Sequence, residues 1–181
     1  FEESYGSQKA EILNELMFQI PVPWGSVRYD AFTYHYAFDY LKRNKPRLLY
    51  IAFDETDEYA HEGKYGQYLK AANALDGFIK NLWDWLQSDY RYKNKTTLIV
   101  TTDHGRGDDP VDSWRQHGSD VEGAEKVWIA VLGPDTPALG EIDNSITIYS
   151  SQIAKTISTL LGVEYTNKEA VGNVIERMIH D

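Results

Sequence analysis

The sequence contains no cysteine, which excludes disulfide bonds, thiolate zinc sites and cysteine nucleophiles. No apolar run is long enough to span a bilayer, so we expect no transmembrane segment. Positive charge is also scarce, because 18 Lys and Arg stand against 28 Asp and Glu and leave a formal net charge of −10. This charge repels phosphodiester backbones, so we expect no extended nucleic-acid binding. A small phosphate or sulfate ester could still bind where a bound divalent ion dominates the local field.

The composition that remains is typical of a globular protein. With 42% hydrophobic and 25% charged residues, we expect residues 1–181 to form a single domain, or a fragment of one, with a buried core. The chain starts at Phe1 rather than Met and shows no basic, apolar signal segment. These features favour a processed or excised piece of a longer protein.

Apolar runs predict strands at residues 48–53, 97–102 and 127–133, with a short edge strand at 146–149. Unbroken aliphatic and β-branched runs are typical of strands that are buried on both faces of a parallel sheet. Helical spacing of apolar residues predicts helices in residues 1–18, from Asp30 to Arg43, at 65–87 and from Ser150 or Ser151 to Leu161, and residues 168–179 form a last short helix or arm. The pattern indicates an α/β fold with a mostly parallel sheet, in which Asp30 caps its helix.

Five possible metal ligands directly follow predicted strands. Asp103 and His104 end the 97–102 run, and Asp57 and His61 are four residues apart after the 48–53 run, on one face if that turn is helical. His117 lies in the loop that follows the 97–102 strand. Each candidate has an alternative. Asp103 and His104 could form a turn with a solvated Asp and a capping His. Asp57 and His61 could belong to an acidic helix N-terminus, and His117 could be a surface loop histidine.

The five candidates share one placement, because the carboxyl ends of parallel strands meet at one edge of a sheet. Two Asp and three His suit a site with two divalent ions that clamp an oxyanion.

With these residues in this order, the sequence resembles the alkaline phosphatase superfamily over residues 46–135, in particular its nucleotide pyrophosphatase/phosphodiesterase and type I phosphatase branch. Sulfatases and cofactor-independent phosphoglycerate mutases are relatives. The resemblance implies a three-layer sandwich with a mostly parallel central sheet. It implies that Asp57, His61 and His117 hold one metal ion and Asp103 and His104 a second. Zinc is usual in this branch and manganese in the mutases; members are commonly exported, which favours a periplasmic or extracellular location.

The sequence also departs from this superfamily. The resemblance implies a further Asp ligand on a first strand and a Ser or Thr nucleophile at a helix start, and residues 1–47 offer neither, unless Thr33 is forced into the role. We therefore expect this chain to be the carboxyl-terminal part of a larger hydrolase. Its expected partner is the missing amino-terminal half of the same protein, and we expect the chain to be inactive when isolated.

The function that the resemblance implies is metal-dependent hydrolysis of phosphate mono- or diesters. Arg106 could contact a non-bridging oxygen of the substrate, or pair with Asp108 or Asp109 instead. The alternatives are a sulfatase or a phosphoglycerate mutase-like enzyme. From other classes, the isolated chain could be a noncatalytic metal-binding fragment or a metal-free binding module.

Overall fold

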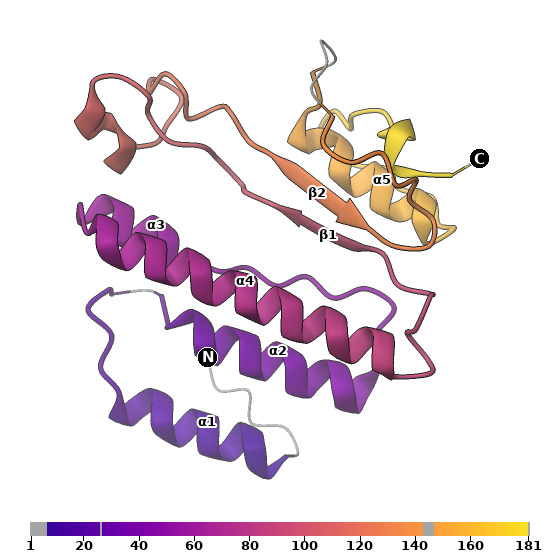
Figure 1. Cartoon of the computed structure of the whole chain (residues 1–181), viewed down its shortest axis with the longest axis horizontal. Coiled ribbons are helices and arrows are strands. Elements are labelled where there is room, and N and C mark those ends of the chain that lie inside the picture. The colour runs from indigo at the N-terminus through magenta and orange to yellow at the C-terminus, as the bar shows by residue number, and fades with distance from the viewer. Residues whose placement is uncertain (1–6, 26, 143–146, 181) are drawn as a thin grey trace. The chain divides into compact units, whose positions relative to one another are not determined.

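The computed structural model describes residues 7–25, 27–142 and 147–180. Figure 1 shows its helices and strands. The chain divides into two compact units: Phe1–Leu82 with Trp114–Gln116, and Trp83–Ser113 with His117–Asp181. Among the described residues, no helix is both long and apolar enough to cross a membrane.

The described elements of the first unit are helical. Helix α1 (Gln8–Gln19) begins at Ser7, whose side chain accepts a hydrogen bond from the amide of Ala10. Buried residues of α1 pack against Phe32 and Tyr36 of α2 (Asp30–Asn44) and form a small core. Both helices were predicted and are confirmed, because their apolar residues recur at helical spacing.

Two further helices follow in the chain. Helix α3 (Glu55–His61) is short and is joined by Gly63, at φ +69°, to the long α4 (Tyr65–Ser88). Phe78 of α4 stacks on Tyr34 of α2, with ring centroids 4.4 Å apart. The prediction of a helix at 65–87 is therefore confirmed to within one residue.

The predicted strand at residues 48–53 is wrong, since none of these residues belongs to a strand. The segment keeps the side-chain alternation of a strand, because Leu48 and Tyr50 are exposed while Leu49 and Ile51 are partly buried. An extended segment becomes a strand only through hydrogen bonds to a neighbour. The strands that the structure describes pair with each other.

The second unit contains a two-stranded sheet of β1 (Leu98–Thr101) and β2 (Ile129–Leu132). Both strands were predicted, but they are antiparallel, with Leu98 opposite Leu132 and Thr101 opposite Ile129. A parallel arrangement needs a crossover that returns the chain to the starting edge, usually a helix. Within residues 102–128 the only helical turn is the 3₁₀ segment η1 (Val111–Arg115), so β2 starts where β1 ends.

The mostly parallel central sheet is thus a wrong prediction for the described residues, and the three-layer sandwich is not confirmed. Burial on both faces is wrong as well, because the β1 side chains are partly buried or exposed. Of the predicted edge strand 146–149, residue 146 lies outside the described residues, and 147–149 form no strand. The class remains α/β.

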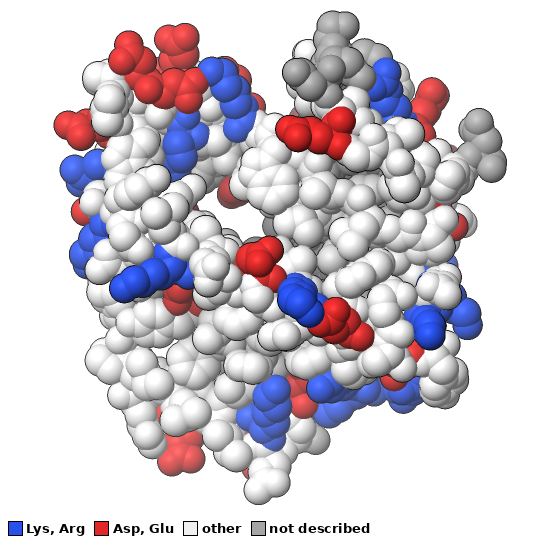
Figure 2. Space-filling model, viewed as in Figure 1, with Lys and Arg blue, Asp and Glu red and all other residues white. Residues whose placement is uncertain are grey.

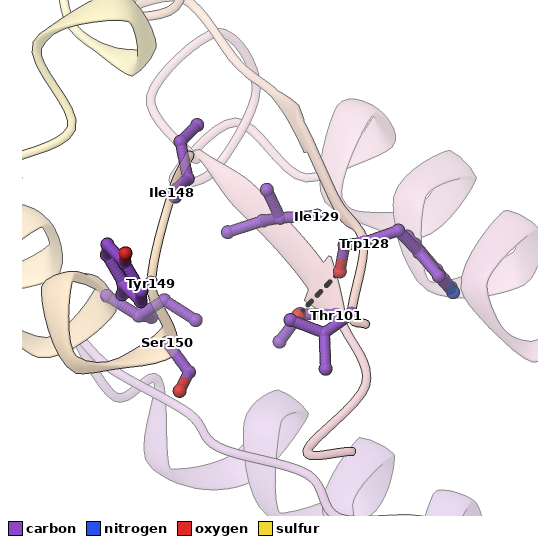
Figure 3. A pocket seen from close by; sticks show the side chains of 8 residues that line it. Thr101, Trp128, Ile129, Ile148, Tyr149 and Ser150 are labelled. Atoms are coloured by element: carbon purple, nitrogen blue, oxygen red, sulfur yellow. Dashed lines mark hydrogen bonds between the residues drawn. The ribbon is translucent and has the colours of Figure 1, made fainter. Parts of the chain in front are cut away.

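The end of the second unit packs beside this sheet. The 3₁₀ segment η2 (Ser150–Gln152) leads into α5 (Ile153–Leu160), and Gly162 follows at φ +67°, as the predicted stop requires. A 3₁₀ turn, η3 (Glu176–Met178), stands in the predicted last arm. A small pocket at the end of β1 is lined by Thr101, Trp128 and Tyr149, and the Thr101 hydroxyl donates to the Trp128 carbonyl at 2.7 Å (Figure 3).

Candidate metal centre

Asp57 and His61 lie on one face of α3, as their four-residue spacing predicted. A carboxylate oxygen of Asp57 is 3.3 Å from Nε2 of His61, and both side chains are partly exposed. Carboxylate and imidazole are donors that zinc and manganese accept. This pair therefore forms half of a candidate metal site within the first unit. The first turn of α3 is acidic, so the alternative prediction of an acidic helix N-terminus also agrees with the structure.

The start of α3 is held by a carboxylate from α2. Asp30 Oδ1 accepts the amide of Asp54 at 2.8 Å and Oδ2 accepts the amide of Glu55 at 3.3 Å, while Glu55 Oε1 accepts the amide of Asp30 at 3.2 Å. The prediction that Asp30 caps its own helix is wrong: Asp30 is the first residue of α2, and its side chain binds the first amides of α3 instead. No local pattern indicated this, because 24 residues separate Asp30 from Asp54.

Asp30 is 2% exposed. Burial raises the pKa of its carboxyl from 3.8 to about 6; the two amide donors oppose this shift, and the negative charges of Glu55 and Asp54 add to it. The anchor is thus a buried carboxylate that is mostly ionised at neutral pH.

Residues 114–116 also belong to the first unit. The Arg115 guanidinium donates to the carbonyl of His61 at 3.0 Å, and the Trp114 ring meets the rings of Tyr65 and Tyr68 edge-on, with centroids 5.5 and 5.8 Å apart. A Cβ on Gly63 would lie 3.1 Å from this guanidinium, so a side chain there would crowd it. No role was predicted for Trp114 and Arg115, although they stand just before the candidate ligand His117.

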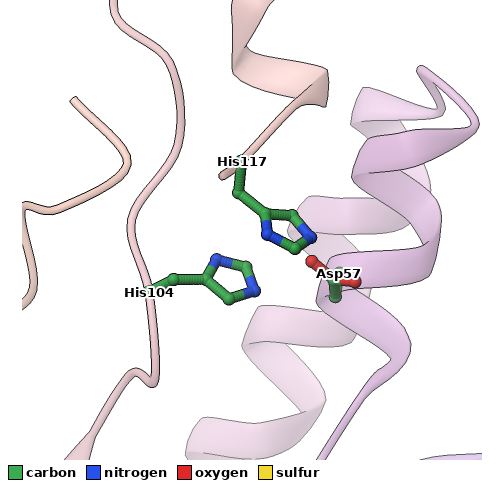
Figure 4. Close-up of side chains that lie close together, drawn as sticks. All are labelled: Asp57, His104 and His117. Atoms are coloured by element: carbon green, nitrogen blue, oxygen red, sulfur yellow. The ribbon is translucent and has the colours of Figure 1, made fainter. Parts of the chain in front are cut away.

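In the second unit, His104 and His117 come together. Their rings are stacked, with centroids 3.7 Å apart and an interplanar angle of 10° (Figure 4). His104 Nδ1 lies 2.9 Å from the Gly105 carbonyl. Because a carbonyl only accepts, Nδ1 carries the hydrogen in the neutral ring, and Nε2 then presents the lone pair that a metal ion needs.

Gly105 sets the backbone beside this ring. Its amide donates to the Ala124 carbonyl at 2.7 Å, and a Cβ at this position would lie 2.3 Å from the Lys126 carbonyl oxygen. Only glycine fits such a close approach without displacing backbone. The glycine after Asp103-His104 thus holds the chain so that the His104 ring can bind the Gly105 carbonyl.

Asp103 follows β1, as predicted, and its side chain is 88% exposed. Its Oδ1 accepts the amide of His104 at 3.0 Å and lies 3.8 Å from His104 Nε2. The carboxylate is therefore close to the imidazole ring and open to solvent. This is the turn with a solvated Asp that the alternative prediction describes, and it also leaves carboxylate lone pairs for an ion.

Arg106 is half-buried in the loop after β1. Asp108, one of the two partners that the alternative prediction offered, forms an ion pair with Lys126. Acidic side chains gather over the loop that carries η1 (Figure 2). The exposed carboxylates of this loop are Asp108, Asp109, Asp112, Asp120, Glu122 and Glu125. Their field attracts cations rather than anions.

The donors fit a divalent metal ion. Zinc binds imidazole nitrogen at about 2.0–2.1 Å, so two nitrogens on one ion are at most about 4 Å apart. One donor nitrogen of His104 and one of His117 lie within 4.8 Å of each other. Their rings are nearly parallel, at 10°, so one ring must turn before both lone pairs can meet at one ion. The contact of His104 Nδ1 with a backbone carbonyl is a further feature that metal-binding histidines share.

Comparison with known proteins gave one match. The family model described as Metalloenzyme superfamily matches residues 27–164, a range that contains all five candidate ligands and Arg106. No curated protein and no solved structure matches the chain.

Proposed function

Because the chain belongs to the Metalloenzyme superfamily, in the alkaline phosphatase-like clan, which indicates a metal-dependent enzyme, we propose that it serves the hydrolysis of phosphate mono- or diesters. The observation that carries this proposal is the Asp57–His61 pair on α3, with the Trp114–Gln116 segment bound beside it. That segment leads directly into His117. Consecutive Cα atoms are about 3.8 Å apart, so the chain itself keeps His117 near a segment that binds the His61 carbonyl.

We propose that Asp57, His61 and His117 bind one divalent ion and that Asp103 and His104 bind a second. A variant of this assignment has His104 and His117, whose rings lie together in the second unit, on a single ion (Figure 4). Zinc is the proposed ion, because imidazoles outnumber carboxylates in the set, and manganese is the alternative.

Bound divalent ions would supply Lewis-acid stabilisation of the oxygen atoms on which charge develops. The chain's own residues hold and orient the donors: Gly105 fixes the His104 ring, and Asp30 and Arg115 fix the two ends of α3. Arg106 is proposed to contact a non-bridging phosphate oxygen through its planar guanidinium. The Ser or Thr nucleophile is proposed to lie in an amino-terminal half that precedes this segment in a longer protein.

Zinc binding tests the ligand assignment. We expect the purified chain to bind zinc and the affinity to fall at least tenfold in Asp57→Asn and in His117→Ala, because each removes a donor. His35→Ala is the control, since His35 lies on α2 with Lys9 as its polar neighbour, at 3.4 Å. Unchanged zinc affinity in both ligand variants would refute the assignment.

A chromogenic phosphate ester tests the second part of the proposal. With zinc added, we expect no turnover by this chain, because the nucleophile is proposed to lie elsewhere. Turnover that His117→Ala abolishes would mean that this chain contains its own nucleophile. Stoichiometric zinc, lost in Asp57→Asn, would exclude a metal-free binding module.

A further inference from the structure

Helix α3 is too short to hold two metal ligands in place by itself. It has seven residues, three of them acidic in the first turn, and its N-cap residue Asp54 makes no side-chain capping bond. Isolated helices of this length are unstable in water, and like charges one turn apart weaken them further. The geometry of Asp57 and His61 therefore depends on contacts from outside the helix.

We propose that Asp30 is a positioning residue of the metal centre, whose carboxylate fixes the first turn of α3 and thereby the direction of Asp57 and His61. This rests on the proposed function in so far as Asp57 and His61 bind metal. Asp30 supplies one oxygen to each of the first two amides, at 2.8 and 3.3 Å, so both translation and rotation of the helix start are restrained. Glu55 returns a bond to the amide of Asp30, which ties α2 and α3 together in both directions.

The residues around Asp30 exclude water from its carboxylate. Trp24 packs edge-on against Tyr29, which precedes Asp30, and against Tyr59 of α3, with ring centroids 5.7 and 5.0 Å apart. The titratable groups that act on the Asp30 carboxyl are Glu55 and Tyr59 of α3 and Asp54, the residue before it. Two of them are acids, and none of the three is a cation that would balance the buried charge.

A buried carboxylate without a cationic partner is a costly way to join two helices. Burial raises the pKa of Asp30 to about 6, so the ionised form is disfavoured in the fold and yet prevails at neutral pH. What the ionised form supplies is acceptor capacity on both oxygens, which a neutral amide of the same shape lacks. Asp30 therefore gives rigidity at the start of α3 at the expense of stability, a combination that is common at functional sites.

Asp30→Asn separates these two effects. It keeps the size of the side chain, replaces one acceptor with an NH₂ group that faces an amide donor, and removes the buried charge. We expect zinc affinity to fall about tenfold, as for other residues that orient metal ligands. We expect the urea midpoint at pH 7 to stay the same or rise, and the amides of Asp54 and Glu55 to exchange faster in the metal-free protein.

Asp39→Asn is the matched control. Asp39 lies on the same helix but accepts from Ser7 and Arg43 rather than from the start of α3. Its substitution should leave zinc affinity unchanged. Asp30→Glu, which keeps the charge and displaces the carboxylate by one methylene, is a second variant and should weaken zinc binding by a similar factor.

Two outcomes overturn the proposal: wild-type zinc affinity in both Asp30 variants, or unchanged exchange of the Asp54 and Glu55 amides in Asp30→Asn. A wild-type chain that binds no zinc would refute the proposed function instead. In that case the amide exchange of metal-free Asp30→Asn still decides whether Asp30 anchors α3.

Discussion

Trp114 offers a direct test of whether the Trp114–Gln116 segment prepares His117 for metal binding. The ring makes two edge-on contacts, with Tyr65 and Tyr68, and Trp114→Ala removes both. Such a contact contributes about 0.5–1.5 kcal/mol beyond the area it buries, so the two together hold the segment by about 2 kcal/mol. The Arg115 bond to the His61 carbonyl remains, but it is exposed and adds little by itself.

In Trp114→Ala the free energy of ordering the segment must come from metal binding. A loss of about 2 kcal/mol corresponds to zinc binding that is about 30-fold weaker. The loss should not exceed that of His117→Ala, which removes the donor itself. The measurement is competition with a chromophoric zinc indicator at pH 7.

Two controls accompany this variant. Trp114→Phe keeps an aromatic ring between the two tyrosines and should restore most of the affinity. Trp128→Ala removes a tryptophan that is 55% exposed on the second unit and should have no effect on zinc affinity. If Trp114→Ala binds zinc as tightly as the wild type, His117 is not held by this segment or is not a ligand, and the reasoning fails.

Three further predictions concern stability and dynamics. Thr156→Val should lower the unfolding free energy by about 1–3 kcal/mol in urea titrations, because it leaves the buried amide of Ile175 without its 2.9 Å acceptor, while Thr159→Val at an exposed position should have little effect. The pKa of the Asp30 carboxyl is raised from 3.8 to about 6, so its contribution to stability is present below pH 4 and is lost as pH rises through 6. The unfolding free energy should therefore fall by about 3 kcal/mol over this range. Asp30→Asn should flatten this dependence on pH. The amides of residues 48–53 should exchange much faster than those of the sheet, since they carry no strand pairing, and equal protection would contradict this.

The helices were predicted well because their signals are local. In α4, apolar residues recur every three or four positions over 24 residues, and the structure begins and ends the helix within one residue of the predicted bounds. In α2, the basic Lys42 and Arg43 lie in the last turn, as the helix dipole favours. Each of these features needs only the residues within one or two turns.

The strands were located but wrongly assembled. An apolar run predicts extended backbone, and residues 98–101 and 129–132 confirm it, but the run does not say which neighbour it pairs with. The polar, helix-poor connection between them was visible in the sequence and favours an antiparallel pair. Residues 48–53 have the alternation of a strand without a partner, which shows that pattern alone does not make a sheet.

The candidate site divides in the same way. The Asp57–His61 pair is four residues apart on one helix, so its geometry followed from sequence spacing. The contacts that hold it join residues far apart in the chain: Asp30 with Asp54, and Arg115 with His61, which are 54 residues apart. Such pairs depend on how the helices pack, which residue spacing does not determine.

The stacked histidines bear on how many ions the proposed centre holds. In two-metal sites the ions lie about 3.5–4 Å apart, so neighbouring ligands of different ions are as close as ligands of one ion. The 3.7 Å between the centroids of the His104 and His117 rings is not a distance between donor atoms, so stoichiometry is what separates the two proposed assignments. If Asp103 and His104 hold their own ion, His104→Ala should reduce two bound zinc ions to one, with the tighter one retained. If the two histidines share an ion, one zinc binds, and either substitution removes it.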